Sequence, residues 1–200
     1  MTAAAKTLII ACGALAREVR ALSDQLPAFD LRCVPATLHN RPQRIVPALE
    51  RILDETGSAY ERTVIAFGDC GTGGALDRLC AARGLERLPG AHCYAFFAGL
   101  SEFDAMMEEE LGTFFLTDFL ARQFETMVIR PLGLDRKPEL RDLYFGHYKR
   151  LVFLSQTDDD DLLANANVAA ARLGLAFEHR PTGLMAFARD LERLSTPLAA

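Results

Sequence analysis

Residues 63–78 read TVIAFGDCGTGGALDR, an apolar run followed by a glycine-rich turn and the start of a helical pattern. A shorter version of the same order occurs in residues 7–17, TLIIACGALAR, where Cys12 and Gly13 end the apolar run. Short apolar runs that give way to helical spacing are typical of strand–helix units in a parallel sheet. Both segments place a Cys-Gly pair at the predicted turn, so the segments that indicate the fold also carry candidate functional residues.

The alternation of strands and helices continues to the end of the chain. The sequence predicts strands over residues 7–11, 29–35, 63–67, 85–88, 113–117, 151–155 and 175–179. It predicts helices over residues 14–26, 42–55, 74–83, 94–111, 118–129, 160–173 and 184–193. Such alternation implies right-handed βαβ units. We therefore expect an α/β fold, with three α/β/α layers and a mostly parallel sheet of about seven strands. The expected domain is single and spans residues 1–200, with a candidate seam between two lobes near residues 131–150.

Composition excludes two classes of partner. The chain has 200 residues, a formal net charge of −5 and no block of Lys or Arg, which disfavours a nucleic-acid surface. Its apolar runs are far shorter than the roughly 20 residues that a membrane span requires. The N-terminus lacks a secretory pattern, and five cysteines are an odd number for a disulfide framework. We expect a cytoplasmic protein with reduced cysteines and a small-molecule ligand.

Three of the cysteines lie at predicted strand-to-helix turns: Cys12, Cys70 and Cys93. In a parallel sheet these turns share one edge, where ligands usually bind. Thiolates there suit a zinc or iron ion with an open fourth position, or an iron–sulfur cluster with one open iron. His39 and His92 are candidate supplementary ligands. The alternative is that these cysteines are small buried apolar residues, since no tight CxxC spacing is present.

The turn after residues 63–67 is a candidate anion site. Gly71, Thr72, Gly73 and Gly74 let the backbone approach a ligand and point N–H groups at it. Asp69 is a candidate base or ligand. The turn matches neither the Walker nor the dinucleotide-binding pattern. The alternative is a tight turn with a helix cap at Thr72.

Further polar residues follow other predicted strands. His39 and Arg41 come after the second strand, where an imidazole moves protons and a guanidinium holds a carboxylate or phosphate. His92 precedes Cys93 and is a candidate base. Asp118 directly follows the predicted strand at 113–117. It is a candidate substrate-binding group, and the alternative is a helix cap.

The chain resembles the uncharacterised family of bacterial and archaeal proteins called domain of unknown function 1638. The resemblance runs from about residue 7 to residue 182. It rests on the motifs Ala11–Glu18, His39–Pro42, Asp69–Gly74, His92–Tyr94, Phe115–Phe119 and Gly133–Arg136.

The resemblance implies a metabolic setting. Some members are encoded near corrinoid-dependent methyltransferases for methylamines, which implies one-carbon or methylated-amine metabolism and a corrinoid or methyltransferase partner. The family pattern commonly has an acidic residue after the Cys-Tyr pair, where this chain has Ala95.

Together these features favour a metal- or iron–sulfur-dependent lyase, hydrolase or transferase that acts on a small polar or anionic molecule. Its ligands would be Cys12, Cys70 and Cys93, with Asp69 or His92 as the proton-transfer group. Two alternatives remain. One is a metal-free enzyme with Cys70 or Cys93 as nucleophile and His92 or His39 as base. The other is a non-catalytic accessory protein of a corrinoid-dependent methyltransferase.

Overall fold

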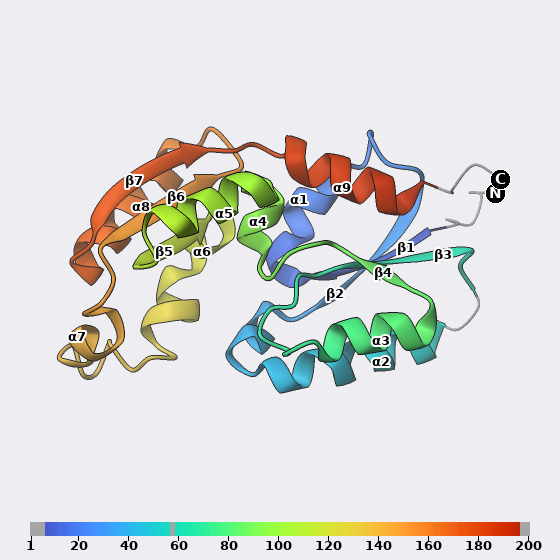
Figure 1. The fold of residues 1–200 in the computed structure, drawn as a ribbon, viewed down its shortest axis with the longest axis horizontal. Coiled ribbons are helices and arrows are strands. Elements are labelled where there is room, and N and C mark those ends of the chain that lie inside the picture. Colours follow the sequence, from blue (N-terminus) through green and yellow to red (C-terminus); the bar gives the residue numbers. More distant parts are fainter. Residues whose placement is uncertain (1–6, 57–58, 197–200) are drawn as a thin grey trace. The chain divides into compact units, whose positions relative to one another are not determined.

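The computed structural model describes residues 7–56 and 59–196, and the chain divides into two units (Figure 1). The first unit combines Met1–Phe96 with Met185–Ala200, and the second is Phe97–Leu184. The boundary therefore falls at residues 96/97 and 184/185, whereas residues 131–150 lie inside the second unit.

The first unit is built on a four-stranded parallel sheet in the order β2-β1-β3-β4. Its strands are β1 (Thr7–Cys12), β2 (Phe29–Val34), β3 (Arg62–Ala66) and β4 (Glu86–Arg87). All six residues of β1 are buried, as expected for a central strand with both faces covered. In the register, Ile9 lies opposite Leu31 on one side and Val64 on the other.

Helices cover both faces of this sheet. Helices α1 and α9 lie on one face and α2 and α3 on the other (Figure 1). The α-helices of the first unit are α1 (Ala16–Ala21), α2 (Ile45–Thr56), α3 (Ala75–Arg83) and α9 (Met185–Ser195), with α4 (Cys93–Ala98) reaching the boundary of the unit. Three 3-10 helices follow β1 and β2, namely η1 (Gly13–Leu15), η2 (Ala36–Asn40) and η3 (Pro42–Arg44).

The second unit is also built on a parallel sheet, which has three strands in the order β5-β6-β7. The strands are β5 (Thr113–Thr117), β6 (Arg150–Ser155) and β7 (Ala176–Pro181). Its helices are α5 (Leu100–Glu109), α6 (Asp118–Phe124), the π-helix η4 (Glu125–Ile129), α7 (Leu140–Phe145) and α8 (Asp160–Leu173). Leu151 and Phe153 of β6 join the core formed with α6 and α8. Because side chains alternate along a strand, Val152 and Leu154 face the other side.

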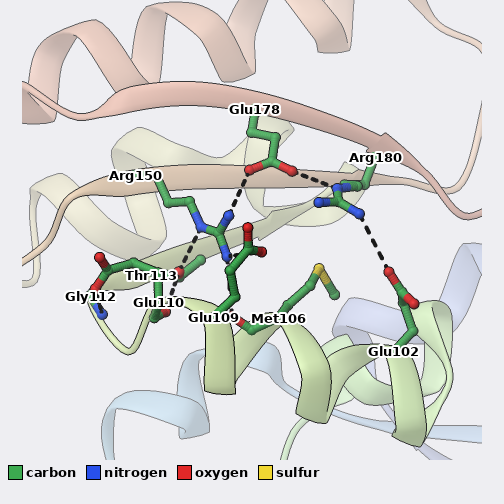
Figure 2. A network of polar contacts seen from close by, with 9 residues as sticks. All are labelled: Glu102, Met106, Glu109, Glu110, Gly112, Thr113, Arg150, Glu178 and Arg180. Atoms are coloured by element: carbon green, nitrogen blue, oxygen red, sulfur yellow. Dashed lines mark hydrogen bonds and ion pairs between the residues drawn. The ribbon is translucent and has the colours of Figure 1, made fainter.

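A network of polar contacts joins α5 to the side of this sheet that Val152 and Leu154 face (Figure 2). The guanidinium of Arg150 donates to Thr113 Oγ1, to the Met106 carbonyl and to the carboxylates of Glu109 and Glu178. Glu178 also accepts from Arg180, which pairs in turn with Glu102. Arg150 is largely buried, so this network fixes the position of α5 on β6 and β7.

The α/β fold with parallel strands and helices in layers is the one that the sequence predicts. The seven strands are divided between two sheets of four and three rather than joined in one. Among residues 7–56 and 59–196, no helix combines the length and the apolar character needed to cross a bilayer.

Candidate functional site

The carboxyl ends of the four strands of the first unit meet along one edge, and the turns that follow them contact each other. The main-chain N–H groups of Asp69 and Cys70 donate to the carbonyls of Gly90 and Ala91, at 3.2 and 2.8 Å. These bonds join the turn after β3 to the turn after β4, which leads to Cys93.

The turns after β1, β2 and β3 also pack closely. A Cβ atom on Gly13 would lie 3.2 Å from the carbonyl oxygen of Val34, and one on Gly71 would lie 3.3 Å from Pro42 Cγ. The turns after β1, β2, β3 and β4, all of which the sequence predicts to carry functional residues, therefore lie together at one edge of this sheet.

Cys12 ends β1 and caps the short helix η1. Its Sγ accepts a hydrogen bond from the Ala14 N–H at 3.5 Å. The Nδ1 atom of His39 lies 3.8 Å from the same sulfur. The structure thus brings together a thiol and an imidazole that are 27 residues apart in sequence.

Cys70 is buried in the turn between β3 and α3. Its φ of 49° lies in the left-handed region, and it is the one non-glycine residue with a positive φ in the part of the chain that the structure describes. A side chain is strained in that conformation by about 1 kcal/mol or more. The turn therefore holds this thiol at the sheet edge at a conformational cost.

Burial raises the pKa values of all three thiols. The pKa of Cys12 rises to about 12 and that of Cys70 to about 11, while that of Cys93 lies well above its ordinary value. After burial, the next cause for Cys93 is electrostatic repulsion from Cys70 and Cys12, and Cys70 also raises the pKa of Cys12. A negative charge on one of these sulfur atoms opposes ionisation of the next, so without a cation the thiols remain neutral.

These neighbouring thiols do not yet form a ligand cage. Within residues 7–56 and 59–196, no three His, Cys, Asp or Glu side chains are already gathered into a set that holds a metal ion. A metal would have to draw the turns closer together.

Glu18 belongs to the same neighbourhood, although it is not among the site residues that the sequence predicts. It is 6% exposed in the first turn of α1, and its charge contributes to the raised pKa of Cys93. The indication in the sequence was its spacing, because Glu18 lies three residues after Leu15 and four before Leu22, both of which are buried. Ala95 is buried in α4.

Asp69 organises the turn that was expected to bind an anion. Its carboxylate accepts hydrogen bonds from Thr72 Oγ1 at 2.6 Å and from the N–H groups of Gly73 and Gly74 at 3.2 and 2.9 Å. The Thr72 hydroxyl, followed by the Gly74 and Gly73 N–H groups, holds the pKa of Asp69 below its ordinary value. Two of the glycine N–H groups assigned to a ligand therefore hold a carboxylate of the chain itself.

The remaining polar residues of this edge come from the turns after β2 and β4. Arg41 and His92 are exposed, and His39 is half-buried. Burial lowers the pKa of His39, and the nearby His92 lowers it further. The two imidazoles therefore interact electrostatically at this edge.

Asp118 belongs to the second unit, where its hydrogen bonds hold the fold together. It is fully buried, and its carboxylate accepts from the main-chain N–H groups of Gln156 and Thr157, each at 3.0 Å, and from the Thr157 hydroxyl. It joins the ends of β5 and β6. A second polar pair lies at the same edge, where Ser155 Oγ and His179 Nε2 are 2.9 Å apart. The sequence pattern does not mark this pair.

A family model matches residues 33–191, which include the turns after β2, β3 and β4 and the whole second unit. The chain belongs to the family described as protein of unknown function (DUF1638). No curated protein and no solved structure shows significant similarity to it. Membership of DUF1638 thus confirms the resemblance but assigns no activity, so the case for a function rests on the residues themselves.

Proposed function

We propose that this protein binds a soft metal ion or an iron–sulfur cluster through Cys12, Cys70 and Cys93, and uses it to act on a small polar or anionic molecule. One observation carries the proposal: the turns that hold Cys12, Cys70 and Cys93 lie together at the carboxyl edge of one sheet, where Cys70 raises the pKa of both other thiols. Parallel α/β sheets generally place their ligand sites at this edge.

The electrostatics of the thiols favour a cation. Burial raises the pKa of each thiol, and a charged Cys70 raises the pKa of Cys12 and Cys93 further, so the metal-free protein keeps all three neutral. Zinc and iron bind thiolate sulfur strongly. Their positive charge stabilises the thiolates, whose formation is opposed by burial and by mutual repulsion. Metal binding at such a site is coupled to proton release.

Two side chains are candidates for a fourth ligand. His39 lies 3.8 Å from the Cys12 sulfur, and buried Glu18 influences the Cys93 thiol. If neither binds the metal, the fourth position is left for a substrate, whose hydroxyl, amine or sulfur would be polarised there.

Proton transfer and anion binding fall to the exposed residues of the same edge. The lowered pKa of Asp69 and its three internal hydrogen bonds make it a weak base, which favours His92 for proton transfer. Arg41 is the exposed cation that would hold an anionic group. The setting we propose is a cytoplasmic one, in one-carbon or methylated-amine metabolism beside a corrinoid-dependent methyltransferase, as the resemblance implies.

The test is metal and acid-labile sulfide analysis, with a UV–visible spectrum, on the full chain purified without oxygen. We expect one metal ion or cluster per chain, lost in each of Cys12→Ser, Cys70→Ser and Cys93→Ser. The matched control is Cys80→Ser, which changes a buried thiol in α3. Iron with sulfide would identify a cluster, and zinc alone would identify a mononuclear site.

Metal-free protein after reconstitution with iron and sulfide, or with zinc, would contradict the proposal. Metal that is retained equally in all three variants would also contradict it. Inactivation by iodoacetamide at a single cysteine of metal-free protein would instead support the thiol enzyme.

A further inference from the structure

The second unit contains a small hollow that the proposed function does not use. Its volume is about 120 Å³. It is lined by Ile129, Leu134, Pro138, Arg141, Arg172 and Leu173. These residues come from the π-helix η4, the segment that follows it, α7 and α8. We propose that this hollow binds a short-chain monocarboxylate.

The floor of the hollow is apolar. Ile129, Leu134 and Leu173 are 0%, 6% and 3% exposed, and all three belong to the core of the second unit. Leu134 lies in the Gly133–Arg136 motif, and Ile129 ends a π-helix, a rare element that is frequent at functional sites. An apolar floor of this kind favours a hydrocarbon group over water or a bare inorganic ion.

Two guanidinium groups line the hollow, and each has N–H donors without a hydrogen-bond partner among the described residues. Arg141 uses Nε and Nη2 to bind Asp142, at 2.8 and 2.7 Å, and Arg172 uses Nη1 to bind Glu125. Neither Arg141 Nη1 nor Arg172 Nη2 has a hydrogen-bond partner among the described residues. Each guanidinium has five N–H donors, so both retain donors for a bound carboxylate.

Gly174 lies next to one of these groups. A Cβ atom at this position would lie 3.5 Å from Arg141 Nη1, the nitrogen that Asp142 does not bind, which is an ordinary contact distance. Arg141 therefore lies against the C-terminal end of α8, next to the residue that follows Leu173.

Size and charge together define the ligand. An engineered apolar cavity of ~150 Å³ accommodates benzene, so this slightly smaller hollow suits an apolar tail of roughly three to five carbons. Because Asp142 and Glu125 balance the charge of the two guanidinium groups, it is their remaining N–H donors that favour a carboxylate, which accepts hydrogen bonds, over an amine. The proposal concerns the second unit only and requires no metal.

The experiment is a titration of the full chain, labelled with ¹³C at its Ile and Leu methyl groups, with sodium butyrate and followed by NMR. We expect saturable shifts at Ile129, Leu134 and Leu173. Butyramide, which has nearly the same shape and no charge, should bind at least tenfold more weakly. Propylammonium and inorganic phosphate should leave these methyl groups unshifted.

Variants locate the carboxylate. Arg141→Gln and Arg172→Gln should each weaken butyrate binding at least tenfold, and Arg44→Gln, an equal charge change in the first unit, should leave it unchanged. If Arg172→Gln fails to fold without its pairing to Glu125, Arg172→Lys keeps the charge but removes the planar fork, and should also weaken binding. Equal binding of butyramide, equal binding of phosphate, or no saturable shift at the methyl groups of Ile129, Leu134 and Leu173 would each overturn the proposal.

Discussion

The guanidinium of Arg62 donates a hydrogen bond to the main-chain carbonyl of Leu194, with 2.9 Å between Nη1 and the oxygen. Arg62 begins β3, and Leu194 lies near the end of α9. The last helix is therefore joined to a strand that precedes it by 132 residues. The first unit is completed only when the chain returns from the second.

This return predicts that α9 is essential to the stability of the first unit. Leu191 is fully buried in α9, whereas Met185, in its first turn, is 86% exposed. Leu191→Ala should lower the free energy of unfolding by about 2 to 5 kcal/mol, because it leaves a cavity. Met185→Ala should change it by less than about 0.5 kcal/mol. Urea unfolding measures both, and equal effects of the two substitutions would show that α9 does not contribute to this core.

Asp118 predicts a large effect of removing one charge. Its buried carboxylate accepts hydrogen bonds from Gln156 and Thr157. Asp118→Asn removes the charge and turns one acceptor into a donor, so we expect a loss of about 3 kcal/mol in the free energy of unfolding. The control is Asp158→Asn, an equal change at an exposed residue in the turn that contains Gln156 and Thr157. A loss no larger than that of the control would contradict the structural role.

Asp69 predicts a pH-dependent contribution to stability. Hydrogen bonds from Thr72, Gly74 and Gly73 lower its pKa in the folded state. A lowered pKa means that the carboxylate stabilises the fold above its unfolded pKa of about 3.9, and that this stabilisation is lost as the pH falls through the folded pKa. Wild type should therefore be more stable than Asp69→Asn at neutral pH, and the difference should shrink in acid. A difference that does not vary with pH in urea unfolding would contradict this.

Metal binding should depend steeply on pH. Because the pKa of Cys12 is about 12 and that of Cys70 about 11, both thiols are protonated at neutral pH. Each thiol that binds a metal releases a proton, so the logarithm of the apparent Cd²⁺ affinity should rise by about three units per pH unit for three ligands. It should rise by about two units in Cys12→Ser. Cadmium–thiolate absorbance in competition with a chelator measures both slopes. Equal slopes would exclude Cys12 as a ligand.

Alkylation distinguishes the metal site from a thiol enzyme. Cys33 is exposed in β2, whereas Cys12 and Cys70 are buried. Neutral, buried thiols react slowly, so iodoacetamide should label Cys33 at least tenfold faster than either. Mass spectrometry of the native protein, with urea-unfolded protein as the reference, gives the rates. Fast labelling of Cys70 or Cys93 would favour a nucleophilic cysteine.

The fold was predictable where the sequence marks both ends of an element. The helix predicted over residues 160–173 has those bounds in the structure, because the chain ends it at Gly174 with a φ of 73°. The helix predicted over residues 14–26 is instead a 3-10 turn followed by α1, which ends at Ala21, and no glycine or proline marks that end. The division into two sheets was not predictable, because each strand–helix unit has the same local pattern whichever sheet it joins.

The candidate site was predictable to a similar degree. Turn positions follow from the strand–helix pattern, which is why Cys12, Cys70, Cys93 and His39 could be placed at one edge. The occupation of the Gly73 and Gly74 N–H groups by Asp69 depends on where one side chain points, which the pattern does not determine. Glu18 was missed because a glutamate in a helix is usually solvated.

The positive φ of Cys70 has a consequence for how natural variation at this position should be interpreted. Glycine adopts this backbone conformation without the steric cost that any other residue carries. Selection for an easily formed turn alone would favour glycine at residue 70, as the chain has at residues 71, 73 and 74. A cysteine that occurs at this position in related proteins would therefore indicate selection for the sulfur atom. A glycine in its place would indicate selection for the turn alone.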